Sequence, residues 1–206
     1  MTQLHVGLIK ESYIMTNNFV RRLVIVVALF LNGCAALDKL NAPHLSGTPA
    51  SSALVVAKVE ASMHGMLGIT TSQEIIGGVL LSTDGSRRID GRAIAGLIIF
   101  ADVPPGEYNL ARVETNWRAG NFINTHRYNV PPESALDFIM SVKLGEPRFL
   151  GLITVEEFRT TSQRGVRFAL KPSNATELDA WAKFVELYQG SPWIGAVEKR
   201  RSDIRN

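Results

Sequence analysis

Apolar and polar residues alternate along most of the chain from Ala53 to Leu170, and this alternation predicts short β-strands. The clearest stretch is Ala135–Leu144, in which every second residue is large and apolar. Successive side chains of a strand point to opposite faces, so this spacing predicts one buried and one solvent-facing side. Further apolar runs predict strands at Ala53–Ala61, Ile75–Ser82, Ala93–Phe100, Tyr108–Thr115, Phe149–Val155 and Val166–Leu170. About seven short strands separated by turns predict a mainly β fold, an antiparallel β-sandwich.

The segment 172–206 changes to a helical pattern. Ser173 or Asn174 can cap a helix, and Glu177 follows Asn174 at the spacing of a capping box. The apolar stripe of this helix consists of Leu178, Trp181, Val185 and Tyr188. Gly190-Ser191-Pro192 ends it, and Trp193–Ile204 predicts a second, shorter helix. We therefore expect one or two C-terminal helices, held on the sandwich by Trp181 and Trp193.

Two short motifs describe the turns of the predicted sandwich. Asp84-Gly85 is a tight-turn dipeptide, and Pro105-Gly106 makes a second turn after which Tyr108 and Leu110 return to the core. The stretch Leu97–Leu110, LIIFADVPPGEYNL, is similar to the hairpin of transthyretin-like and carboxypeptidase-regulatory-like β-sandwich modules. This resemblance covers about residues 90–155 and implies an immunoglobulin- or transthyretin-like fold without implying an activity.

The N-terminus has the features of a secretory signal. Arg21 and Arg22 precede an unbroken apolar run, Leu23–Leu31. As a helix this run would be about 13 Å long, too short to cross a hydrocarbon core of about 30 Å. Residues 1–33 are therefore predicted to be a signal peptide. Because Met15 opens a compact basic segment, we expect translation to begin there.

Leu31-Asn32-Gly33-Cys34 resembles the lipobox of bacterial lipoproteins. The resemblance implies cleavage before Cys34 and a lipid, including palmitate, on that residue. Ala35 after the cysteine implies sorting to the outer membrane, with the protein facing the periplasm. The Pro-, Gly- and Ser-containing segment 34–52 is then expected to be a flexible tether. It leads to a sandwich domain over 53–171 and a helical segment over 172–206.

Composition and charge exclude several classes of protein. The chain has 206 residues, 46% of them hydrophobic and 20% charged, which is typical of a folded domain. Its net charge of +3 falls to +1 when residues 1–33 are removed, so nothing favours nucleic acid as a partner. The single cysteine excludes a disulfide framework within the chain and a multi-cysteine zinc site.

Catalytic and metal-binding motifs are missing from the sequence. It contains no H-E-x-x-H, G-x-S-x-G, G-x-G-x-x-G or P-loop pattern. His64 and His126 are the histidines of the predicted domain, and their spacing selects no metal site. We therefore predict no catalytic residues, cofactor or metal.

One segment, Trp117–Tyr128, combines aromatic and polar side chains as a binding surface does. Its candidate ligand-binding residues are Trp117, Phe122, His126, Arg127 and Tyr128. Alternatively, these residues only extend a hairpin, with Trp117 opposite Tyr128.

The sequence as a whole predicts a non-catalytic binding or scaffolding accessory of the cell envelope, anchored to the membrane by its lipid. Its expected partner is an envelope protein or peptidoglycan. A glycan- or peptide-binding module using the Trp117–Tyr128 segment is the alternative. A third possibility is an envelope hydrolase, which would need His64 or His126 beside a carboxylate.

Overall fold

The computed structural model describes residues 42, 45–65, 69–131, 138–159, 164–171 and 173–206, which form nine strands and two helices. The strands are β1 (Ala53–His64), β2 (Thr70–Ser82), β3 (Arg88–Ile94), β4 (Leu97–Val103), β5 (Gly106–Ala119), β6 (Phe122–Asn129), β7 (Ile139–Val142), β8 (Pro147–Arg159) and β9 (Arg164–Lys171). The helices are α3 (Asn174–Leu187) and α4 (Ile194–Arg205). The expected signal peptide, Met15, Cys34 and the tether up to residue 41 lie outside the described residues.

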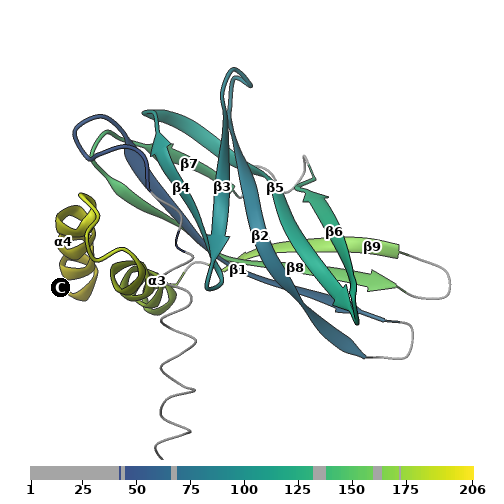
Figure 1. The fold of residues 1–206 in the computed structure, drawn as a ribbon. Coiled ribbons are helices and arrows are strands. Elements are labelled where there is room, and N and C mark those ends of the chain that lie inside the picture. The colour runs from purple at the N-terminus through teal and green to yellow at the C-terminus, as the bar shows by residue number, and fades with distance from the viewer. Residues whose placement is uncertain (1–41, 43–44, 66–68, 132–137, 160–163, 172) are drawn as a thin grey trace, which may run out of the picture. The chain divides into compact units, whose positions relative to one another are not determined.

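The strands form one continuous sheet, in the order β6-β5-β2-β3-β4-β1-β8-β9 (Figure 1). β7 pairs with the start of β5, and β1 also pairs with β2, so that β1, β2, β3 and β4 make a closed ring. The predicted mainly β fold with C-terminal helices is confirmed. The antiparallel expectation is wrong for one pair, since β1 and β8 run parallel from Leu54 opposite Pro147 to His64 opposite Phe158. β2–β7 lie between β1 and β8 in the sequence, and β8 then pairs with β1 in the same direction.

The sheet curls around a core that lies on its inner face. Alternate side chains of β1, β5 and β8 lie on this face, and those of Val55, Leu110 and Ile153 are fully buried. Phe138 beside β7 meets Phe168 of β9 edge to face, with ring centroids 6.5 Å apart. The β7 and β9 sides of the sheet therefore meet across the core through side chains.

Turn residues explain where the strand predictions succeeded and failed. Pro105-Gly106 joins β4 to β5, and Tyr108 and Leu110 are fully buried, as expected. The expected hairpin is wrong, because β4 pairs with β1 and β3 whereas β5 pairs with β2, β6 and β7. The single strand expected over Ala93–Phe100 is wrong: Ala95 and Gly96 take φ values of 50° and 78° and form a tight turn between β3 and β4. An alanine at positive φ is uncommon, so this turn was hard to predict from residue type.

The alternation predicted over Ala135–Leu144 is confirmed for its described central part. Phe138, Met140 and Val142 are buried, whereas Ile139 between them is exposed. Leu144 is exposed and not buried as the alternation predicted, because the chain leaves the sheet there and turns at Gly145 (φ 75°).

The C-terminal helices cover the outer face of the sheet. Trp181 and Trp193 are fully buried in a cluster that includes Leu54 and Val56 of β1, so their predicted packing role is confirmed. Ser173 caps α3 by accepting a hydrogen bond from Thr176 N. The capping box predicted for Glu177 is wrong, because this carboxylate is buried and bonds to the side chains of Trp181 and Arg200 instead. Within the described residues, neither helix has the length and apolar content needed to cross a membrane.

The N-terminal boundary of the domain lies before β1. Ala42 and Leu45 pack against the same helix cluster. Thr48 accepts backbone hydrogen bonds from Ser51 and Ser52, and Ser52 is buried. The described part of the expected tether thus lies on the domain.

Candidate functional site

The β5–β6 hairpin positions the predicted binding segment. Its register sets Val113 opposite Tyr128, Thr115 opposite His126 and Trp117 opposite Asn124. The alternative in which Trp117 lies opposite Tyr128 is therefore wrong in register, although the hairpin itself is present. Directly paired residues share a face, and Val113 and Tyr128 are buried in the core.

The inner face of this hairpin carries four of the five predicted residues. Counting in steps of two from Tyr128 places His126, Asn124 and Phe122 on the inner face of β6, and Trp117 on that of β5. Arg127 does not join them. It points to the outer face, where its Nε lies 3.5 Å from the carboxylate of Glu114.

A buried polar network lies beneath this row, inside the curled sheet. Tyr128 donates its hydroxyl proton to Glu157 of β8 over 2.7 Å and accepts a bond of 2.9 Å from the Gln73 amide of β2. Thr115 of β5 donates to the carbonyl oxygen of the same Gln73 side chain. Glu157 has no exposed surface. A buried carboxylate needs such donors, because leaving water without them is costly.

His126 extends the network toward solvent. Its Nδ1 lies 3.2 Å from the Glu157 carboxylate and 3.0 Å from the Tyr128 hydroxyl, and its side chain keeps 17% of its surface exposed. With the proton on Nδ1, the ring donates to Glu157 and leaves Nε2 for an outside group. No bond from Nε2 is seen within the described part of the chain.

The chemistry of this cluster favours a structural role, the stabilisation of the buried Glu157 carboxylate, over the activation of a nucleophile. Burial and the bond to Glu157 raise the pKa of Tyr128 to about 12. A phenol with a raised pKa is a poorer source of phenolate, whereas nucleophilic catalysis requires a lowered pKa or an adjacent base that takes the proton. The hydrolase hypothesis needed a histidine beside a carboxylate, and His126 meets that geometric condition, but the raised pKa of Tyr128 does not favour its hydroxyl as a nucleophile.

The row of inner-face residues ends at one end of the sheet. The end of β1 and the start of β2, the turn between β5 and β6, and the end of β8 and the start of β9 all lie at this end (Figure 1). At this end Phe122 is 76% exposed, and Val166 of β9 is also exposed. We call this end, with Trp117, Phe122, Asn124 and His126 on its inner face, the hairpin mouth.

Sequence reasoning missed the partners that make the network. Gln73, Thr115 and Glu157 come from three strands separated by many residues, and only folding brings them together. One signal was available: Glu157 continues the apolar alternation of Ile153 and Val155, which places a carboxylate on the buried face of a strand. His64 is half-buried, and its Nδ1 lies 2.9 Å from the Thr70 hydroxyl. No group of three or more metal-ligating side chains occurs among the residues that the structure describes.

Comparison of the chain with protein-family models, with curated proteins and with solved structures finds no match in any of the three.

Proposed function

We propose that this chain is a lipid-anchored protein of the bacterial cell envelope whose β domain binds a glycan without chemical turnover, at the hairpin mouth. In this proposal it is located at the periplasmic face of the outer membrane, and its partner is peptidoglycan. The observation that carries the binding site is the row of Trp117, Asn124 and His126 above a buried network that fixes the His126 ring. The lipid anchor rests on the sequence around Cys34.

The chemistry of the mouth fits a sugar. An indole face packs against the C–H side of a pyranose ring, while amide and imidazole groups bond its hydroxyls. Trp117 is half-buried and Asn124 is exposed, so both keep surface for a ligand. The bonds from Nδ1 to Glu157 and Tyr128 hold His126 in one orientation, which lowers the entropy lost on binding.

The finer fold assignment belongs to the same proposal. The Pro105-Gly106 turn and the buried Tyr108 and Leu110 support a transthyretin-like module, in which the curled sheet encloses its core as two layers.

Tryptophan fluorescence tests the binding site directly. Trp181 and Trp193 have no exposed surface, so Trp117 is the tryptophan that solvent and ligand can reach. Soluble peptidoglycan fragments should shift its emission and protect it from acrylamide quenching. An unchanged emission and quenching constant at millimolar fragment would reject the site.

Calorimetry of variants supplies a readout that does not depend on the probe. Trp117→Leu and His126→Ala should each weaken fragment binding about tenfold or more, since each removes one of the few strong contacts. Arg127→Gln is the matched control, because Arg127 lies on the same strand but on the outer face. Equal losses in all three variants would show that hairpin stability, and not the mouth, governs binding.

The anchor is tested by the mass of the protein recovered from membranes. The proposal expects a chain that begins at Cys34 and carries acyl groups, and expects Cys34→Ala to lose them. A full-length, unmodified chain would refute the anchor and leave the mouth to be judged by its own experiment.

A further inference from the structure

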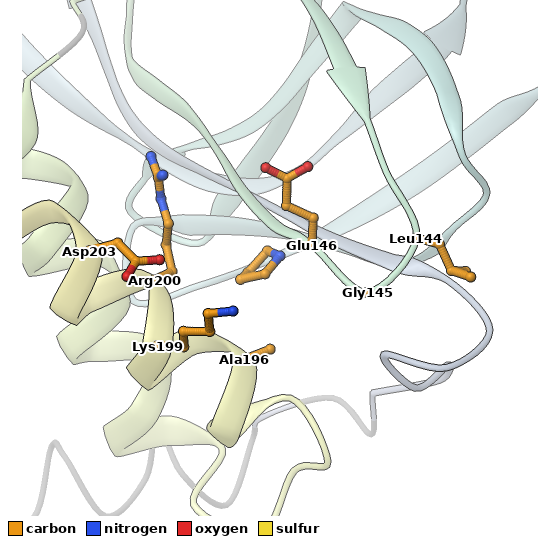
Figure 2. Close-up of a pocket in the computed structure, with 8 residues that line it drawn as sticks. Leu144, Gly145, Glu146, Ala196, Lys199, Arg200 and Asp203 are labelled. Atoms are coloured by element: carbon orange, nitrogen blue, oxygen red, sulfur yellow. The ribbon is translucent and has the colours of Figure 1, made fainter.

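A pocket lies between α4 and the turn from β7 to β8 (Figure 2). Figure 1 shows α4 on the side of the domain away from the hairpin mouth. Its volume is about 280 Å³, at the small end of the range for ligand sites. Pro147 and Ala196 give it apolar walls. Four charged side chains surround it: Glu146, Lys199, Arg200 and Asp203.

The four charged side chains are two cations and two anions, and one of the cations, Arg200, is held in place by hydrogen bonds. Arg200 donates bonds of 2.7 and 3.3 Å to the two carboxylate oxygens of Glu177, which also accepts from Trp181. These bonds raise the pKa of Arg200, with smaller contributions from Glu146 and Asp203. The guanidinium is therefore a permanent, oriented charge on the pocket wall.

Two of the four charges have no partner within the described part of the chain. Lys199 and Asp203 are exposed and make no ion pair there, and Figure 2 shows them on the same side of the pocket, on α4. Glu146 lies on the strand side of the pocket and keeps one long contact of 3.4 Å with Arg148. A ligand with one negative and one positive group would give Lys199 and Asp203 each an oppositely charged partner.

The chain enters the domain beside this pocket. Gly145 N donates to Ser52 O over 2.9 Å, and Ala42 packs in the same cluster as Ala196. Cys34 precedes Ala42 by eight residues, which span at most about 28 Å. A lipid on Cys34 would hold this side of the domain close to the membrane. Leu144, on the pocket rim, is 54% exposed and apolar, as a residue touching the lipid interface would be.

We infer that this pocket binds the zwitterionic headgroup of a phospholipid, phosphoethanolamine, and so sets the orientation of the domain on its membrane. The phosphate lies against Lys199 and Arg200, and the ammonium lies between Glu146 and Asp203. The inference rests on the proposed lipid anchor for its biological setting, but the binding itself needs no lipid on Cys34.

The headgroup can be offered without acyl chains. Glycerophosphoethanolamine is titrated into the full chain in phosphate-free maltoside micelles, and binding is followed by broadening of its ³¹P resonance. Saturable broadening is expected, with glycerol 3-phosphate and inorganic phosphate about tenfold weaker because they lack the ammonium. Equal binding of all three compounds, or no broadening, would overturn the inference.

Variants separate the two ends of the ligand. Lys199→Gln should weaken both glycerophosphoethanolamine and glycerol 3-phosphate, whereas Asp203→Asn should weaken only the compound with the ammonium. Arg167→Gln removes an exposed cation at the other end of β8–β9 and should change neither. Loss of binding in Arg167→Gln, or no loss in Lys199→Gln, would contradict the assignment.

The Cys34→Ala variant distinguishes failure of the headgroup-binding proposal from failure of the lipid-anchor proposal. If it keeps headgroup binding while membranes yield an unmodified wild-type protein, the pocket stands and the anchor falls. If the wild type carries acyl groups but binds no headgroup, the anchor stands and the pocket assignment falls.

Discussion

The hydroxyl of Tyr128 is the centre of the buried network, and its removal gives a sharp test of what that network contributes to stability. Tyr128→Phe keeps the ring that packs in the core and deletes one oxygen. That oxygen donates to the Glu157 carboxylate over 2.7 Å and accepts from Gln73 over 2.9 Å. Its loss leaves each of the two buried groups with one partner fewer.

The expected cost follows from the two bonds. A hydrogen bond to a buried charge contributes about 1.5–3 kcal/mol and a neutral one about 0.5–1.5 kcal/mol. Tyr128→Phe should therefore lower the free energy of unfolding by about 2–4 kcal/mol. With a urea dependence of about 2 kcal/mol per molar, the midpoint should fall by about 1–2 M.

The matched control is Tyr108→Phe. Tyr108 is also a fully buried tyrosine of the core, but its hydroxyl has no hydrogen-bond partner among the described residues. Deleting that oxygen should leave stability unchanged or raise it slightly. Urea unfolding followed by far-UV circular dichroism compares the two variants. If Tyr128→Phe costs no more than Tyr108→Phe, the network does not stabilise the fold and the reasoning from its geometry is refuted.

Two further predictions concern pH and packing. Burial raises the pKa of both Tyr128 and Tyr188 to about 12. The stability that the two neutral phenols provide is therefore complete below pH 10 and is lost as the pH rises to 12. Between these pH values the urea midpoint of Tyr128→Phe should fall about half as steeply as that of the wild type, and an equal slope would contradict the assignment. Gly91→Ala should lower the free energy of unfolding by about 1–3 kcal/mol, because the added Cβ would lie 2.5 Å from the Phe100 ring. Gly190→Ala is the control: its Cβ meets nothing within 4 Å, so thermal unfolding of this variant should match that of the wild type.

Local patterns predicted the elements of this fold better than their pairing. The alternation around Met140 predicted a buried face that the structure contains, whereas the hairpin predicted around Pro105-Gly106 is wrong, because the strands β4 and β5 that this turn joins do not pair with each other. The parallel pairing of β1 with β8 had no local signal, because strand partners far apart in the chain leave no mark on either strand's own pattern. The turn at Ala95 was hidden for another reason: an alanine rarely adopts its backbone conformation.

The candidate site was predictable only where its residues lie close together in the sequence. Trp117 and His126 stood out by residue type within one short segment, and the hairpin does place them on one face. Arg127, which we grouped with them, lies on the opposite face, since strand geometry sends adjacent residues to opposite faces. Glu157, which fixes His126, lies 31 positions away and was reachable only through the fold.

The central place of β1 has a consequence for how the chain folds. β1 bonds β4 on one side and β8 on the other, and Val56 lies opposite Phe149, 93 positions later. The first strand to leave the ribosome therefore lacks one neighbour until most of the polypeptide has been made. Pairings of such long range close slowly, because a large loop must be ordered before any contact forms. We therefore expect the β1–β8 pairing to form late in folding, after the local pairings of β2 with β3 and of β5 with β6.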